Sequence, residues 1–310
     1  MPQTLPRTLV LTADPARPCL GEAVLRRIRA LLPQSADNDG RWLAKGEAWE
    51  SGLSTLRDEE TLGLLDEART AVAALPVDVN IVAGDTAVRR KRLLVADMES
   101  TIIEQEMLDE LADYAGLRAS ISVITARAMR GELDFVAALT ERVRLLAGLD
   151  AGILDEVFAR ITLTPGAAIL TRTMKAHGAC VALVSGGFTC FTARVAERLG
   201  LDSHHANTLD IAGGKLAGTV AQPILGAEAK LATMERLAAE QGLPRDATLA
   251  VGDGANDIPM LTGAGLGVAF RPKPKVAAHV AALRNGALIQ HGDLTALLYL
   301  QGYAKDAVAA

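Results

Sequence analysis

Short apolar runs alternate with amphipathic stretches along most of the chain, which is the pattern of an α/β protein. The run Leu93–Ala96 is apolar at every position and predicts a strand buried on both faces of a parallel sheet. Strands and helices alternate again from Thr164 onward. The expected strands there are Ala179–Val184, Thr248–Val251, Leu266–Phe270 and Ala287–Ile289. The expected helices are Phe188–Leu199, Lys230–Gln241, one opening at Ile258–Leu261, and Lys275–Leu283.

The segment between residues 104 and 163 contains helical patterns only. Its apolar positions recur at helical spacing, as in Leu108, Leu111 and Ala112. We therefore predict a helical cap, residues 104–163, inserted after the first strand of a doubly wound core that spans residues 91–310. Farther along, Ala212-Gly213-Gly214 favours a hairpin between two strands, which are Ala206–Ile211 and Lys215–Val220.

Residues 1–90 form a separate predicted domain of the small α+β type. Strands are expected at Thr8–Thr12 and Val77–Val82, and Arg41–Trp49 predicts one further strand. Helical patterns lie near Gly21–Leu32 and Glu59–Leu75. This region contains no recognisable set of catalytic groups.

Composition narrows the class of protein. Half of the 310 residues are hydrophobic, which allows a sizeable core, and the net charge of −5 offers nucleic acid no general attraction. The basic cluster Arg89–Arg92 is the exception, and we expect it to be a solvated lead-in to the strand that follows it.

The cysteines and the apolar runs indicate where the protein works. Cys19, Cys180 and Cys190 form an odd, sparse set without CxxC spacing, which fits neither a disulfide framework nor a zinc site. No run reaches about 18 apolar residues, and the N-terminal apolar stretch is too short for a signal peptide. The expectation is a soluble cytoplasmic protein without membrane contact.

Carboxylates follow two of the predicted strands, at the sheet edge where parallel sheets bind ligands. Asp97 follows Leu93–Ala96, Asp253 follows Leu249–Val251, and Asp257 comes four residues later. Such carboxylates repel each other unless a divalent cation lies between them, and oxygen-only ligands favour Mg²⁺ over zinc. An ordinary helix N-cap role for Asp97 stays open at this stage.

Two further segments favour anion binding. Ser185-Gly186-Gly187 follows an apolar strand, and its glycines let backbone N–H groups approach an anion, although a plain tight turn uses the same residues. Lys230 opens a predicted helix, where a cation opposes the helix dipole. A nearby anionic cluster would explain that placement, and an exposed surface lysine is the alternative.

In this order, the motifs around Asp97, Ser185, Lys230 and DGANDIPM resemble the haloacid dehalogenase superfamily. The segments QEMLDELADYAG, AMRGELDFVAALTERVRLLAG and ANTLDIAGGKLAGTV are further similar to the phosphoserine phosphatase family. The resemblance implies a Rossmann-like core with a helical cap, an ACT-like domain at residues 1–90 and a Mg²⁺ cofactor. It also implies hydrolysis of O-phosphoserine to serine and phosphate through an aspartyl-phosphate, the last step of serine biosynthesis.

The same resemblance implies a role for each matching residue. Asp97 would be the nucleophile and Glu99 the general acid/base. Mg²⁺ would be held by Asp97, the backbone carbonyl of Glu99 and Asp253, with Asp257 in support. The phosphoryl-binding residues would be Ser185, Gly186, Gly187, Lys230 and Asn256. In the cap, the residues that hold the substrate would be Glu106 for its amino group, Arg142 for its carboxylate, and Met129 and Phe135 for apolar contact.

Glu99 departs from the family pattern, which usually reads DxDST. Glutamate carries the same carboxyl group on one more methylene, which reaches about 1.5 Å farther. The chemistry can survive this change, but the rate and the leaving-group preference come into question. Arg142 has its own alternative, a solvated helix face, since Arg144 stands two positions on.

Other functions remain open from the sequence. The substrate of such an enzyme could be another small phosphomonoester, such as phosphoethanolamine or phosphohomoserine, although Glu106 and Arg142 together suit an amino acid zwitterion. A phospho-receiver domain also uses an Asp, a hydroxyl and a Lys, but it needs neither the insert nor a second acidic motif. A ligand sensor built on residues 1–90 is a third reading. The sequence leaves the oligomeric state, including a homodimer, undecided.

Overall fold

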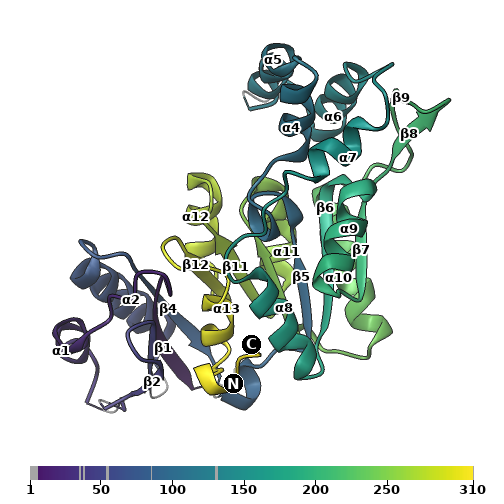
Figure 1. The fold of residues 1–310 in the computed structure, drawn as a ribbon. Coiled ribbons are helices and arrows are strands. Elements are labelled where there is room, and N and C mark those ends of the chain that lie inside the picture. The colour runs from purple at the N-terminus through teal and green to yellow at the C-terminus, as the bar shows by residue number, and fades with distance from the viewer. Residues whose placement is uncertain are drawn as a thin grey trace.

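The computed structural model describes residues 6–34, 36–37, 39–53, 56–84, 86–129 and 132–309. Three parts are visible in Figure 1: an N-terminal sheet with two helices, a central parallel sheet covered by helices, and a group of helices that stands above the central sheet. The α/β class predicted from the sequence is confirmed.

The central sheet has six parallel strands in the order β12-β11-β10-β5-β6-β7. These strands are β5 (Leu93–Ala96), β6 (Cys180–Phe188), β7 (Ser203–Asn207), β10 (Thr248–Gly252), β11 (Leu266–Phe270) and β12 (Gly286–Ile289). Strand β5 is central, and its side chains alternate between the two faces, so an all-apolar sequence is required. Ala96 is in register with Val251 of β10, which brings the residues after both strands to the same sheet edge.

Helices cover both faces of this sheet (Figure 1). One face packs against α8 (Ala167–Ala176), α9 (Thr189–Leu199) and α13 (Ala296–Leu300). The other packs against α10 (Ala227–Glu240), α11 (Ile258–Gly263) and α12 (Pro274–Ala281). This is the doubly wound arrangement that the alternation of strands and helices predicts.

The helices above the sheet are α4 (Met107–Tyr114), α5 (Arg118–Met129), α6 (Phe135–Arg144) and α7 (Ile153–Phe158). We call α4–α7 the cap. Its two connections to the core run side by side: Ile103 forms an antiparallel bridge with Leu163, and Thr164 N–H donates to Ile102 O at 3.0 Å. The hairpin of β8 (Leu209–Ala212) and β9 (Lys215–Val220) packs on the cap, where Gly148 N–H donates to Leu216 O at 2.8 Å.

The N-terminal domain is an antiparallel sheet of order β2-β3-β1-β4. Its elements are β1 (Arg7–Ala13), α1 (Glu22–Arg29), β2 (Arg41–Ala44), β3 (Ala48–Leu53), α2 (Asp58–Val72) and β4 (Val77–Ala83), followed by the short α3 (Thr86–Arg89). Apolar side chains of the sheet and of both longer helices share one core, so α1 and α2 cover a single face.

The N-terminal domain contacts the core through β4 and β12. The Asn80 side chain donates to the Leu288 carbonyl at 2.9 Å and accepts from its N–H at 2.8 Å. The Asp78 carboxylate accepts from Gln290 N at 2.9 Å and from Gly292 N at 2.8 Å. Two side chains of one sheet thus satisfy backbone groups in and just after β12, the edge strand of the other, and so occupy that edge.

Two expected strands differ in the structure. Arg41–Trp49 was predicted as one strand, which was wrong: it contains β2, a turn and the start of β3. Gly46 lies in that turn with φ of 82°, a value that favours glycine. The expected strand Ala206–Ile211 is divided between the end of β7, in the core sheet, and β8, in the hairpin.

The basic cluster before β5 is not uniformly solvated, so that expectation was wrong. Arg89 is buried and forms a 2.7 Å ion pair with Glu50 of the N-terminal domain. Lys91 is also buried, and its Nζ donates to the Asp246 carbonyl at 2.7 Å. Tertiary contacts with distant segments supply these partners, and the local sequence carries no sign of them.

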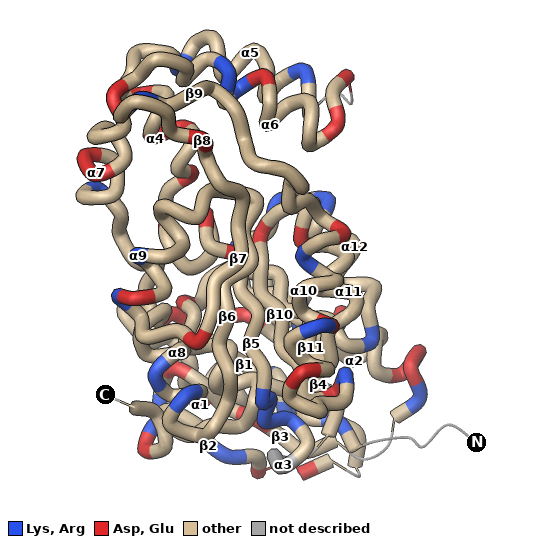
Figure 2. Tube along the Cα trace, turned by 90° about the vertical axis from the view of Figure 1, so that its right-hand side faces the viewer, with Lys and Arg blue, Asp and Glu red and all other residues tan. Residues whose placement is uncertain are grey.

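Charges of both signs are intermixed along the tube in Figure 2, from the cap to the N-terminal domain. Among the residues described, every helix is too short or too polar to cross a lipid bilayer.

Candidate active site

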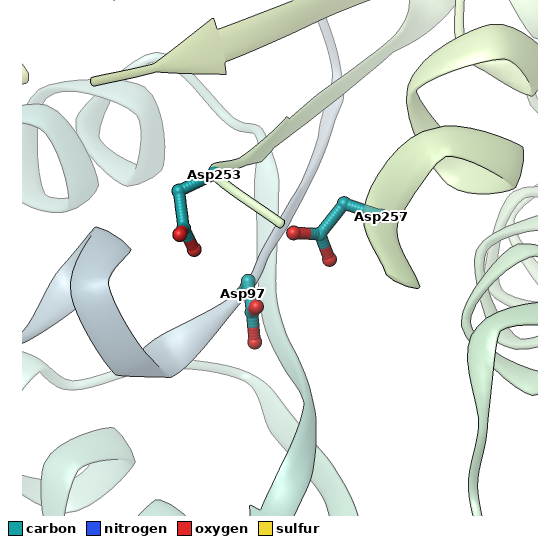
Figure 3. Close-up of side chains that lie close together, drawn as sticks. All are labelled: Asp97, Asp253 and Asp257. Carbon is teal, nitrogen blue, oxygen red and sulfur yellow. The ribbon is translucent and has the colours of Figure 1, made fainter. Parts of the chain in front are cut away.

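Three buried carboxylates meet at the edge of the central sheet (Figure 3). Asp97 follows β5, Asp253 follows β10, and Asp257 ends a short turn after β10. One carboxylate oxygen from each lies within 4.8 Å of the others. The parallel register of β5 and β10 creates this meeting, because Asp97 N–H donates to Val251 O at 2.9 Å, directly beside the Asp253 loop.

Lys230 partly neutralises this cluster from inside the protein. It lies in the first turn of α10, is fully buried, and places Nζ 2.6 Å from Asp257 Oδ1 and 2.9 Å from Asp97 Oδ2. The two carboxylates raise the pKa of Lys230 against the opposing effect of burial. The anionic cluster thus explains a lysine at a helix N-terminus, and the exposed-surface alternative is wrong.

The cluster fits a divalent cation. Burial raises the pKa of Asp97, and the Asp257 carboxylate raises it further. Burial also raises the pKa of Asp253. Three clustered carboxylates carry more negative charge than the single buried Lys230 balances, and an all-oxygen donor set is what Mg²⁺ prefers.

The loop after β5 connects the carboxylate cluster to the cap. Asp97 accepts a hydrogen bond from Met98 N–H at 2.7 Å, so it also caps the following turn. The Glu99 carboxylate accepts from Met107 N–H, at the start of α4, at 2.9 Å. Burial and the nearby Glu106 carboxylate raise the pKa of Glu99 to about 7. A carboxyl group with this pKa can both donate and accept a proton near neutral pH.

A cavity of about 210 Å³ opens between the core and the cap. Its core-side walls contain Asp97, Glu99, Gly186, Gly187, Phe188, Asp253, Asn256 and Lys273. Its cap-side walls contain Glu106, Leu108, Phe135, Leu139 and Arg142. Acidic, basic and apolar side chains of the core and of the cap thus line the same cavity.

The glycines of the Ser185-Gly186-Gly187 segment are needed for close approach. A Cβ on Gly187 would lie 2.8 Å from the Glu99 carboxylate, and one on Gly186 would lie 3.2 Å from the Phe135 ring. The segment belongs to β6 itself, so the expectation that it follows the strand was wrong, and the alternative of a plain tight turn is wrong as well. Ser185 is fully buried, and its hydroxyl accepts from Gly187 N–H at 3.0 Å.

Arg142 reaches the cavity from α6, with its Nε donating to Ala138 O at 3.2 Å. Burial lowers the pKa of Arg142, whereas the Asp109 and Glu99 carboxylates raise it. The guanidinium is therefore partly desolvated in acidic surroundings, and the alternative of a solvated helix face was wrong. Glu106 lines the same cavity and accepts a hydrogen bond from Ser100 Oγ at 2.8 Å.

A comparison with known protein families shows to which family this chain belongs. The family model described as haloacid dehalogenase-like hydrolase matches residues 94–262, more than half of the chain. The chain belongs to the haloacid dehalogenase-like hydrolase family.

Individual relatives agree with this assignment. A phosphoserine phosphatase of Streptomyces coelicolor is 46% identical over 253 residues, which are 81% of this chain and 60% of the relative. A probable phosphoserine phosphatase of Schizosaccharomyces pombe is 39% identical over 82% of this chain and 84% of its own. The chain therefore spans about 60% of the length of the Streptomyces protein. The crystal structure of a HAD family hydrolase from Salmonella enterica serovar Typhi superposes with a TM-score of 0.82 at 29% identity, over 97% of this chain and 99% of that one.

Not every predicted residue of this haloacid dehalogenase-like hydrolase lines the cavity. Lys230, Asp257 and Ser185 are buried and are not among its lining residues, although Lys230 contacts Asp97, which is. Phe135, Asn256 and the two glycines do line it. Met129 ends α5, and its side chain lies outside the described part of the structure.

Sequence reasoning missed Lys273. This residue follows β11 and lines the cavity, with Nζ 3.3 Å from Asp253 Oδ2. The available signal was its position shortly after a third strand of the parallel sheet, where ligand-contacting residues are expected. The apolar lining residues Leu108, Leu139 and Phe188 were also missed, because apolar side chains give no chemical signal in a sequence.

Proposed function

We propose that this haloacid dehalogenase-like hydrolase is a Mg²⁺-dependent phosphoserine phosphatase. It hydrolyses O-phosphoserine to serine and phosphate, the last step of serine biosynthesis. The observation that carries the proposal is the shared cavity: the nucleophile Asp97 with its buried carboxylates faces the same volume as Glu106 and Arg142 of the cap. The names of the Streptomyces and Schizosaccharomyces relatives support this substrate.

The donor set suits one Mg²⁺ ion. Asp97, Asp253 and the backbone carbonyl of Glu99 would hold it, and Asp257 would orient its hydration shell and Lys230. When bound, the ion supplies positive charge to the phosphoryl oxygens.

The reaction proceeds in two displacements at phosphorus, and side chains of this protein take part in both. Asp97 Oδ attacks phosphorus, the P–O bond to serine breaks, and Glu99 donates its proton to the departing serine oxygen. Glu99, now a carboxylate, takes a proton from a water molecule that attacks the aspartyl-phosphate and releases phosphate from Asp97. A pKa of about 7 for Glu99 allows both steps.

Phosphoryl oxygens are held by groups around the nucleophile. These groups are Ser185, the backbone of Gly186 and Gly187, Lys230 and Asn256. Donors fixed before the substrate arrives stabilise charge without reorganising during the reaction. Lys230 is held by two carboxylates, and the Ser185 hydroxyl is fixed in place by accepting from Gly187 N–H.

The cap recognises the amino acid part of the substrate. Glu106 binds the ammonium group and Arg142 the carboxylate, while Phe135 supplies apolar contact. Burial of Arg142 strengthens its attraction for a carboxylate, because fewer water molecules compete. The cap thus selects a zwitterionic phosphomonoester over one that has a single charged end.

Phosphate release from a set of phosphomonoesters tests the proposal. We expect phosphoserine to be hydrolysed faster than phosphoethanolamine, and we expect EDTA to stop both reactions. Asp97→Asn should abolish turnover and the phosphoenzyme while the far-UV circular dichroism spectrum stays unchanged. Turnover by Asp97→Asn at the parent rate, or indifference to the carboxylate of the substrate, would refute the proposal.

A further inference from the structure

Lys273 forms an ion pair with a carboxylate of the carboxylate cluster. Its Nζ lies 3.3 Å from Asp253 Oδ2, and the two side chains differ strongly in exposure, at 64% for Lys273 and 8% for Asp253. Lys230 neutralises Asp97 and Asp257 from inside the protein. Lys273 therefore neutralises the third carboxylate from the solvent side.

The backbone at Lys273 is anchored while its side chain has room to move. Lys273 N–H donates to Asp253 O at 3.2 Å, and Pro274 starts α12 directly after it. A second cavity of about 320 Å³ borders the same ion pair, and Ser100, Glu104, Thr164 and Arg271 contribute to its walls. Open space therefore lies beside the largely exposed Lys273 side chain, next to its ion pair with Asp253.

An ammonium group at this place opposes a divalent cation in two ways. It occupies an oxygen of Asp253, which is one of the expected metal ligands, and its charge repels any second cation beside that oxygen.

We propose that Lys273 is the counter-ion of Asp253 in the metal-free protein and that it must release this carboxylate when Mg²⁺ binds. Lys273 keeps the buried Asp253 carboxylate paired before the ion arrives, and its presence weakens Mg²⁺ binding. This inference rests on the proposed function for the identity of the ion, and it deepens it by naming the residue that sets the ion's affinity. Lys273 is a positioning residue in this role, since it acts through Asp253.

Metal binding without substrate tests the inference. Isothermal titration of the metal-stripped full chain with MgCl₂ gives a dissociation constant that does not depend on catalysis. We expect Lys273→Met to tighten Mg²⁺ binding by about two- to tenfold, the range of a partly exposed ion pair plus the relieved repulsion. Lys273→Gln should tighten it similarly, and the advantage of both variants should shrink as ionic strength rises.

Two control variants separate the charge from other effects. Lys273→Arg keeps the charge and should keep an affinity close to that of the parent. Lys275→Met removes an exposed lysine two positions on, in α12, and should leave the affinity unchanged. In EDTA, Lys273→Met should melt at a lower temperature than the parent, and Mg²⁺ should raise its melting temperature by more.

The outcomes are distinct. Unchanged or weaker Mg²⁺ binding by Lys273→Met and Lys273→Gln would overturn the inference, as would a parent protein that does not bind Mg²⁺. A change confined to the KM for phosphoserine would also overturn it, because Lys273 would then contact substrate. If the affinity shifts as expected but phosphoserine is not hydrolysed, the inference stands and the proposed function fails.

Discussion

Lys230 Nζ lies 2.6 Å from Asp257 Oδ1 in a pair whose side chains are both almost completely buried. The same ammonium group contacts Asp97 at 2.9 Å. Desolvating such charges is costly, and well-packed apolar residues of similar volume are often at least as stabilising. Under the proposed function these charges have a use, because Lys230 holds the nucleophile Asp97 in its ionised form beside the phosphoryl group of the substrate.

Lys230→Met should destabilise the protein by about 3–5 kcal/mol, because it leaves two buried carboxylates without their cation. Urea unfolding in EDTA measures this free energy. The matched control is Lys175→Met, which removes an exposed ion pair with Asp202 and should cost less than about 1 kcal/mol. Equal losses for the two variants would show that the buried trio contributes no special stability.

Arg142→Ala should raise the KM for phosphoserine by roughly ten- to a hundredfold, which corresponds to a lost charged hydrogen bond of about 1.5–3 kcal/mol. The KM for phosphoethanolamine, which has no carboxylate, should change little. Arg144→Ala, two positions along and exposed, serves as the control and should behave as the parent. An equal loss on both substrates would mean that Arg142 only supports the cap.

The pKa of Glu99 predicts a pH dependence with a definite sign. The first displacement needs Glu99 protonated, and kcat/KM covers only the steps up to the aspartyl-phosphate. We therefore expect kcat/KM for phosphoserine to fall as pH rises above about 7, the pKa that burial and Glu106 give to Glu99. The fall should be absent for p-nitrophenyl phosphate, whose leaving group needs no proton. A descending limb shared by both substrates would assign it to another group.

Two substitutions of Glu99 test separately whether its ionisable proton and the length of its side chain are needed. Glu99→Gln should lose on the order of 10²–10⁴ in rate on phosphoserine, the usual contribution of acid–base catalysis. The loss should be smaller with p-nitrophenyl phosphate, and phosphoenzyme should accumulate because the second step lacks its base. Glu99→Asp restores the usual family motif and should retain substantial activity. Phosphoserine hydrolysis by Glu99→Gln at the parent rate would exclude the assigned role.

Asn80→Ala tests the contact between the N-terminal domain and the core. The variant leaves the N–H and C=O groups of Leu288 without their partner, so we expect a loss of about 1–3 kcal/mol in the free energy of unfolding. Asn80 is not among the residues that line the cavity, and kcat of the folded variant should stay at the parent value. Unchanged stability would show that β12 does not depend on this contact.

Much of this protein follows from its sequence by itself. Leu93–Ala96 and Leu249–Val251 are short runs that are apolar at every position, as in a strand covered on both faces, so the sequence predicts a parallel sheet. Parallel strands end at one edge, so the order of the motifs also brings Asp97 and Asp253 together. The candidate site was predictable for this reason: its chemistry lies in residue types at strand ends.

Other features depended on the tertiary structure. The burial of Arg89 and Lys91 rests on Glu50 and on the carbonyl of Asp246, partners that are distant in the sequence. Asn80 and Asp78 read as ordinary strand residues until the fold places β12 beside them. In the sequence, Lys273 is one lysine among several. Only the structure shows that its ammonium group lies 3.3 Å from the Asp253 carboxylate. The periodicity of apolar residues indicates which face of a helix or strand is buried. The partners of a polar side chain depend instead on how separate elements pack against one another. A local sequence pattern does not contain that information.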